Sequence, residues 1–233
     1  MEFRPISLAK EAPIAIPKGM HFALKWLGGL MKNQQTEALH IPLTEKLKSI
    51  PEIFGIRFNE EPEYDLLFED GDFEVRRYSA QLMAHVTLQN VTFDEFREAA
   101  FYKLAHFIFG GNTKKTDVAM TSPVLQVEEA PKTWTMSFVL PAEYTLTSIP
   151  KPIDASIQIA QVAGYDTAIM RYTGSNSYES MKTHEQKLMA WIARQNQFEF
   201  FGPVYFAQYD APFVIPFLRR NEVCVKVIPQ RKH

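Results

Sequence analysis

Several features that would narrow the function quickly are scarce in this 233-residue chain. It contains one cysteine, Cys224, so no disulfide can form within the chain. Cys224 lies in an alternating run, VCVKV, which favours a small strand residue over a nucleophile. The net charge is only −2, so the sequence lacks the excess of basic residues that is typical of a nucleic-acid surface. We therefore expect no nucleic-acid partner.

Long apolar runs and enzyme motifs are also missing. No segment reaches the roughly 18–20 apolar residues that cross a bilayer. The N-terminus, MEFRPISLAKEAP, lacks the basic, apolar and small-residue zones of a signal peptide. The sequence has no HExxH motif, no nucleophile elbow, no phosphate-binding glycine loop and no metal-site spacing of Cys and His. These absences favour a cytoplasmic protein that is not an enzyme.

Residues 1–62 differ in composition from the rest of the chain. They hold six of the fifteen prolines, which predicts an arm with short helices at Gly19–Lys32 and Thr44–Ser49. The first helix would carry one apolar stripe, formed by Met20, Leu24, Leu27 and Met31. This stripe could lie on a membrane surface through residues 19–34, but we favour packing on the protein itself or self-association with a second copy.

From residue 63 the pattern changes to strands and amphipathic helices, and we predict one domain over 63–228 with a short tail at 229–233. Strands are predicted at Tyr64–Glu69, Phe73–Tyr78, Leu82–Gln89, Val118–Glu128, Trp134–Leu140, Ser156–Ala163, Asp166–Tyr172, Val204–Gln208 and Glu222–Val227. Asp70-Gly71-Asp72 is a hairpin signal between the first two strands. Helices are predicted at Thr92–Phe109, with a capping box of Thr92 and Glu95, and at Ser177–Gln195.

The order strand–helix–strand–strand occurs twice along this domain. The two copies are offset by about 85 residues, an offset that aligns Phe93 with Tyr178. Such a duplication predicts an α+β fold, in which two pseudo-symmetric repeats form a curved antiparallel sheet or distorted β-barrel with two helices against it.

The first predicted helix has an unusually wide apolar face. Its core stripe is widened by neighbouring apolar residues to nearly half of the circumference, and basic residues lie within and beside it. The resulting candidate binding face consists of Arg97, Phe101, Lys103, Leu104, Ala105 and Ile108. A large flat apolar ligand with anionic groups would suit this face. Alternatively, the extra apolar arc packs against the N-terminal arm and Arg97 pairs with a nearby acid.

The six histidines do not identify a metal ligand. His106 lies toward the polar side of the first helix, and His184 lies on the buried stripe of the second. His85 falls in a strand, and the remaining three lie in the arm or at the C-terminus: His21, His40 and His233. A lone histidine on a buried stripe is more often a hydrogen-bonded core residue than an iron ligand.

Two segments contain sequence motifs that are specific to one protein family. Residues 101–124 read FYKLAHFIFGGNTKKTDVAMTSPV, and residues 205–227 read YFAQYDAPFVIPFLRRNEVCVKV. Their order and separation closely resemble the SOUL haem-binding proteins, over about residues 63–228. The resemblance implies a distorted β-barrel with two helices and pseudo-twofold symmetry. It also implies a haem site beside the first helix, with basic residues near the propionates.

The resemblance and the wide apolar face together predict non-catalytic binding of haem or a related tetrapyrrole, for buffering, delivery or sensing. A sensor for other planar amphipathic molecules, similar to the multidrug-sensing domains of transcription regulators, is the alternative. An enzyme acting on such a ligand is a third possibility. Whether side chains ligate the iron, and which ones, is left open.

Overall fold

The computed structural model describes residues 59–210 and 214–230, all within one compact unit of the chain. The predicted helices and self-association of the N-terminal arm lie outside the described residues. The division into arm, domain and tail remains a prediction.

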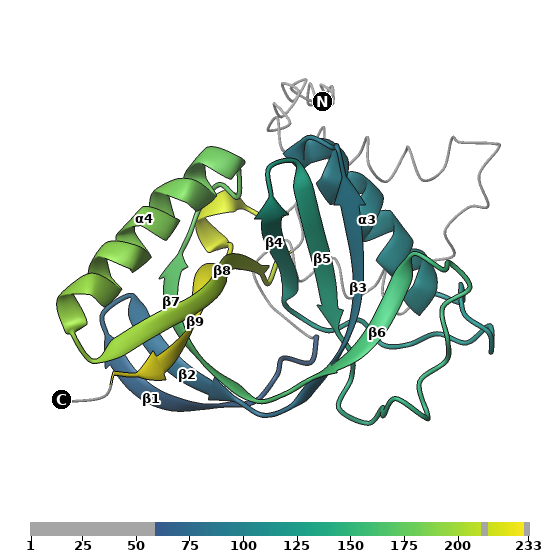
Figure 1. The fold of residues 1–233 in the computed structure, drawn as a ribbon. Coiled ribbons are helices and arrows are strands. Elements are labelled where there is room, and N and C mark those ends of the chain that lie inside the picture. The colour runs from purple at the N-terminus through teal and green to yellow at the C-terminus, as the bar shows by residue number, and fades with distance from the viewer. Residues whose placement is uncertain (1–58, 211–213, 231–233) are drawn as a thin grey trace, which may run out of the picture. The chain divides into compact units, whose positions relative to one another are not determined.

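The described residues form an α+β fold with one antiparallel sheet of nine strands, as the sequence predicts (Figure 1). The strands are β1 (Tyr64–Asp70), β2 (Phe73–Tyr78), β3 (Gln81–Gln89), β4 (Val124–Ala130), β5 (Thr133–Val139), β6 (Ile157–Val162), β7 (Tyr165–Tyr172), β8 (Phe198–Gln208) and β9 (Asn221–Pro229). The helices are α3 (Phe93–Ile108), α4 (Tyr178–Gln195) and the 3-10 turn η1 (Pro216–Leu218). The strand order is β1-β2-β7-β9-β8-β4-β5-β3-β6, so the sheet is curved but not closed.

Both long helices cover the same face of the sheet, each over its own half. α3 contacts β3 and β5, whereas α4 contacts β7, β8 and β9. The first core cluster lies under α3 and the second under α4, and Phe93 packs against both. Phe93 also lies 5.7 Å from the ring of Tyr178, so the first residues of the two helices touch. The predicted strand–helix–strand–strand order is therefore present twice, while the pseudo-twofold superposition of the halves stays a prediction.

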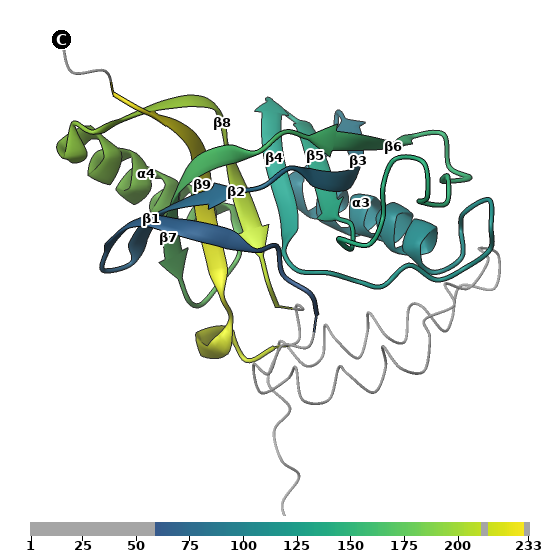
Figure 2. The same cartoon turned by 90° about the horizontal axis from the view of Figure 1, so that it is seen from below.

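A continuous two-stranded ribbon joins the two halves. β2 pairs with β7, β3 pairs with β6, and both pairings share one register across the connections Ser79–Ala80 and Ala163–Gly164. The two connections run side by side from one half to the other (Figures 1 and 2). The halves meet a second time where β4 pairs with β8.

The Gly-Gly-Asn sequence after α3 has three separate structural roles. Gly110 has a φ of +100°, in the region that favours glycine. A Cβ on Gly111 would overlap the ring and the carbonyl of His106. The Asn112 side chain, fully buried, donates to the carbonyls of Phe107 and Thr116 and accepts from two backbone amides of the loop. The motif therefore fixes the exit of the helix.

Two predicted strands were wrong in extent. The strand predicted from Val118 begins only at β4, because residues before it make local contacts such as the bond from Val118 N to the Ile108 carbonyl. β8 begins at Phe198, six residues before the predicted start at Val204. Gly202-Pro203 signals a break, but a bulge between Phe201 and Tyr205 accommodates this dipeptide within the strand.

The ribbon generates a testable prediction at Gly164. A Cβ there would lie 2.9 Å from the carbonyl oxygen of Tyr78, which is backbone and cannot rotate away. We expect Gly164→Ala to lower the free energy of unfolding by about 1–3 kcal/mol, measured by urea denaturation. Ser79→Ala, an exposed change in the opposite connection, is the matched control and should have little effect. An unchanged midpoint for Gly164→Ala would show that the ribbon adapts freely.

Candidate functional site

The structure separates the six predicted binding residues into a buried group and a partly exposed group. Leu104, Ala105 and Ile108 are 0–1% exposed. Leu104 and Ile108 share a core cluster with Val118 and Ile149, which follow α3 in the chain. These three residues therefore present no free surface to a ligand.

The other three predicted residues reach the surface at least in part. Phe101 is half-buried, with its ring edge-on to Phe138 at 5.5 Å. The Lys103 ammonium is 2.6 Å from Asp154 and also donates to Ser156. This ion pair lowers the pKa of Asp154 to about 2. Lys103 is thus already partnered, unlike the third residue, Arg97.

Arg97 is a cation that forms no ion pair with the described residues. Its guanidinium lies over the Phe93 ring, 5.4 Å from the centroid, and makes no hydrogen bond or ion pair within residues 59–210 and 214–230. Burial lowers the pKa of Arg97; Asp94 opposes this shift and the positive charge of Arg219 adds to it. The charges of Arg97 and Arg219 therefore lie within electrostatic range of each other.

Polar side chains continue across the same face between the helices. Gln126 of β4, fully buried, donates to Gln208 of β8 at 2.7 Å. Gln126 Oε1 and Gln208 Nε2 have no partner among the described residues. On the α4 side, Tyr172 of β7 stacks on the ring of His184 at 3.8 Å. We define the interhelix cluster as Arg97, Gln126, Tyr172, His184, Gln208 and Arg219.

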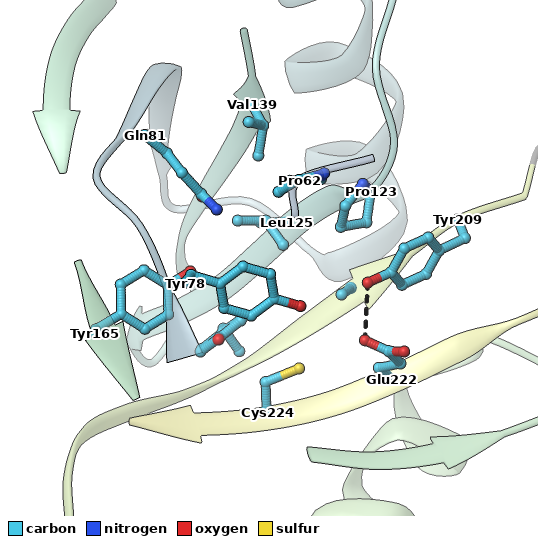
Figure 3. Close-up of a pocket in the computed structure, with 12 residues that line it drawn as sticks. Pro62, Tyr78, Gln81, Pro123, Leu125, Val139, Tyr165, Tyr209, Glu222 and Cys224 are labelled. Atoms are coloured by element: carbon cyan, nitrogen blue, oxygen red, sulfur yellow. Dashed lines mark hydrogen bonds between the residues drawn. The ribbon is translucent and has the colours of Figure 1, made fainter. Parts of the chain in front are cut away.

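The opposite, helix-free face contains a small cavity of about 20 Å³ where the two halves meet (Figure 3). Four tyrosines line it together with residues from both halves of the sheet: Pro62, Tyr78, Gln81, Pro123, Leu125, Val139, Tyr165, Tyr205, Ala207, Tyr209, Glu222 and Cys224. Such a volume accommodates about one water molecule. Figure 3 shows the Tyr209 hydroxyl directed at the Glu222 carboxylate, to which it donates at 2.9 Å.

A network of buried charges lies beside this cavity. Arg76, which is fully buried, donates to both oxygens of Glu222, each at 3.1 Å, and also to Glu74. Arg220 binds Glu222 at 2.9 Å, and Arg171 binds Glu74 at 2.8 Å. Burial alone would lower the pKa of Arg76, but the two carboxylates outweigh it and raise the pKa. Arg220 also binds Glu61 at 2.9 Å, so the three arginines of the network face three glutamates.

The Arg219–Glu222 segment and Cys224 have structural roles. Arg219 donates to the Val214 carbonyl and Asn221 to the Gly174 carbonyl, so the segment fixes the last turn. Cys224 is a buried free thiol in β9. Burial raises its pKa well above the usual value, which makes the thiolate form unfavourable.

The described residues contain no cluster of three or more His, Cys, Asp or Glu side chains that could hold a metal ion. Their three histidines are separate: His85 lies in β3, His106 stacks on Tyr102 at the end of α3, and His184 joins the interhelix cluster. Within residues 59–210 and 214–230, neither helix combines the length and apolar character needed to cross a membrane.

Family comparison decides the relationship of the chain to known proteins. The model of the SOUL heme-binding protein family matches residues 59–226, which is most of the chain. The chain belongs to the SOUL heme-binding family. This membership confirms the resemblance seen in the two sequence segments and supports binding of haem or another tetrapyrrole.

Individual relatives agree with this assignment. The chain is 27% identical to Heme-binding protein 2 of Homo sapiens over 161 residues, covering 66% of this chain and 76% of that protein. The mouse protein of the same name is also 27% identical, over 163 residues.

Two solved structures share the fold of this SOUL chain at low sequence identity. A hydrolase from Listeria innocua has a TM-score of 0.51 and 11% identity, covering 70% of this chain and 94% of that one. The EcmrR–DNA complex has a TM-score of 0.52 and 10% identity, covering 89% of this chain and 81% of the EcmrR chain. These likenesses concern the fold alone.

Sequence reasoning missed several members of both polar groups. Arg76 and Glu222 are 146 positions apart, so their contact has no local signal. Glu74 and Arg76 alternate with buried Val75 in one strand, which would have placed both charges on the same face. Gln126 and Gln208 lie in two different strands, each among apolar residues, and nothing in the sequence indicates that their side chains meet.

The buried network generates a prediction about stability. Glu222→Gln removes the negative charge that pairs with buried Arg76. We therefore expect the free energy of unfolding to fall by about 3 kcal/mol or more in chemical denaturation. Asp166→Asn is the control, because its partner Arg77 is 56% exposed and such a pair contributes less than about 1 kcal/mol. Equal effects of the two substitutions would contradict the structural importance of the buried pair.

Proposed function

We propose that the protein binds haem or a related tetrapyrrole without catalysing its conversion, and that the ligand lies on the helix-bearing face beside α3. Buffering, delivery or sensing of the ligand is consistent with such binding. Membership in the SOUL heme-binding family supports the ligand class. The observation that carries the proposed position is Arg97, a desolvated cation that forms no ion pair with the described residues.

The chemistry of the interhelix cluster fits a porphyrin. A propionate carboxylate would give Arg97 the ion pair that it lacks, and a charge-assisted hydrogen bond to a guanidinium is among the stronger polar contacts. Gln126 Oε1 and Gln208 Nε2 offer an acceptor and a donor that have no partner among the described residues. Buried polar groups in this state gain from a ligand or water that completes their hydrogen bonds.

The apolar part of the ligand would contact the half-exposed edge of α3. Phe101 supplies aromatic surface there, next to Arg97 by one turn of helix. Leu104, Ala105 and Ile108 would support this edge from within the core rather than touch the macrocycle. Lys103 lies on another side of α3 from Arg97 and pairs with Asp154 beside β6, so it would not contact a ligand bound at the interhelix cluster.

The tyrosine-lined cavity is much less suitable for the same ligand. Its volume of about 20 Å³ corresponds to about one water molecule, whereas ligand pockets usually reach several hundred Å³. Its one carboxylate, Glu222, is already bound by Arg76, Arg220 and Tyr209.

A sensor for other planar amphipathic molecules is the second candidate. It is favoured by the fold, which EcmrR shares, and by the aromatic walls of the cavity. A hydrolase also shares the fold, but at 11% identity this likeness does not favour an enzyme. Activity data would be needed to support an enzymatic role. Titrations with haemin, protoporphyrin IX, biliverdin and an organic cation would rank these alternatives, because preference for the cation would favour the sensor.

Arg97 generates the prediction that tests this position. We expect Arg97→Met to weaken haemin binding about fivefold, corresponding to about 1 kcal/mol for an ion pair near the surface, and to reduce its salt dependence. The thermal stability of the free protein should not fall, because the substitution removes a desolvated, unpaired charge and keeps the apolar stem. Absorption titrations and thermal unfolding measure the two effects.

Arg194→Met is the matched control for this prediction. Arg194 is exposed in the last turn of α4, so the substitution makes the same change in net charge away from the cluster. Haemin affinity that falls equally in both variants would indicate a general charge effect. Affinity that is unchanged in both would place the ligand elsewhere.

A further inference from the structure

His184 is half-buried and is held by two contacts, one with Tyr172 and one with the backbone of its own helix. It lies in the second turn of α4, and its ring stacks almost parallel on Tyr172, at 3.8 Å and 11°. Tyr172 is itself within electrostatic range of Arg97, since that cation lowers the pKa of the tyrosine against the larger raising effect of burial. One tyrosine thus links a histidine on α4 to the unpaired cation on α3.

A hydrogen bond determines the tautomer of His184. Its Nδ1 lies 2.7 Å from the carbonyl oxygen of Ser180. A carbonyl oxygen only accepts, so Nδ1 must carry the proton and donate it. In the neutral ring, Nε2 then holds an unshared electron pair, and it makes no hydrogen bond within residues 59–210 and 214–230. Histidines that ligate metals are commonly oriented in this way, with the other ring nitrogen donating to a carbonyl.

The other described histidines do not share this combination. His106 stands at the far end of α3, where its ring packs against Gly111. His85 lies in β3, where it alternates with core residues Ala84 and Val86 and therefore faces the helix-free side. His184 is thus the described histidine that belongs to the interhelix cluster.

We propose that Nε2 of His184 is an axial ligand of the iron when haem occupies the site between α3 and α4, an inference that rests on the tetrapyrrole site proposed above. The bond forms by donation of the Nε2 electron pair to the iron, and a water molecule leaves if one was bound there. Tyr172 acts as a positioning residue, because its ring restricts the rotation of the imidazole. Arg97 holds a carboxylate at the edge of the same macrocycle.

The experiment compares two porphyrins on three proteins. Haemin and metal-free protoporphyrin IX are titrated into the full-length parent, His184→Ala and His106→Ala. Absorption and electron paramagnetic resonance spectra report the iron ligands, and quenching of tryptophan fluorescence reports binding of either porphyrin. For the parent we expect the spectrum of a histidine-ligated ferric haem, and the same spectrum for His106→Ala.

For His184→Ala we expect loss of the histidine-ligated spectrum and a fall in haemin affinity of about tenfold or more. Protoporphyrin IX has no iron, so its affinity should stay within about twofold of the parent value. Retained binding of protoporphyrin IX also excludes a variant that merely fails to fold, because such a variant would lose affinity for both porphyrins.

The failures of the two proposals are distinguishable. If neither porphyrin binds the parent, the proposed function is wrong. If both bind and the haemin spectrum is the same in His184→Ala, the function stands and His184 is not the ligand. If the ligated spectrum is lost only in His106→Ala, the iron ligand is His106 at the end of α3, and the inference is overturned.

Discussion

The bidentate ion pair between Arg76 and Glu222 is the interaction on which the helix-free side of the sheet depends. It connects β2 with β9, which are separated by β7 in the sheet. Both charges are removed from water, and a buried charge is tolerated only when its partner stays at hydrogen-bond distance. Arg220 and Tyr209 also bind the Glu222 carboxylate, and Arg171 binds Glu74, the second partner of Arg76. The last turn and the cavity wall are therefore fixed by the same ion pair.

The two faces of the sheet therefore differ in how completely their polar groups are matched. On the helix-free face, the buried arginines and glutamates pair with one another. On the helix-bearing face, Arg97 and the amide atoms of Gln126 and Gln208 lack partners among the described residues. Unmatched polarity is costly to maintain, and it is common where a ligand supplies the missing contacts. This contrast, more than cavity volume, is the reason for proposing the interhelix cluster as the binding region.

Local sequence signals predicted the elements of the fold well. The capping box of Thr92 and Glu95 was placed correctly because it depends on neighbouring residues alone. The Asp-Gly hairpin between β1 and β2 was correct for the same reason. The predicted start of β8 at Val204 was wrong, because the bulge that carries the strand back to Phe198 depends on pairing with β9 and is a property of two strands.

The candidate site was less predictable, because it depends on contacts between distant segments. The helical wheel correctly grouped Leu104, Ala105 and Ile108 as apolar, but it could not show that they are covered within the core. Likewise, periodicity placed His184 on the buried stripe of α4, while its stacking on Tyr172 requires knowledge of how α4 lies on β7.

The shared register of the β2–β3 and β6–β7 ribbon limits how this fold can change in length. Side chains alternate between the two faces along each strand, so one residue inserted in a single connection would either bulge or turn half of a strand inside out. Both halves keep their apolar faces under their helices only when the two connections change together and by an even number of residues. Homologues that have diverged in length at this point should therefore show compensating insertions at two positions that are some eighty residues apart in sequence but adjacent in space.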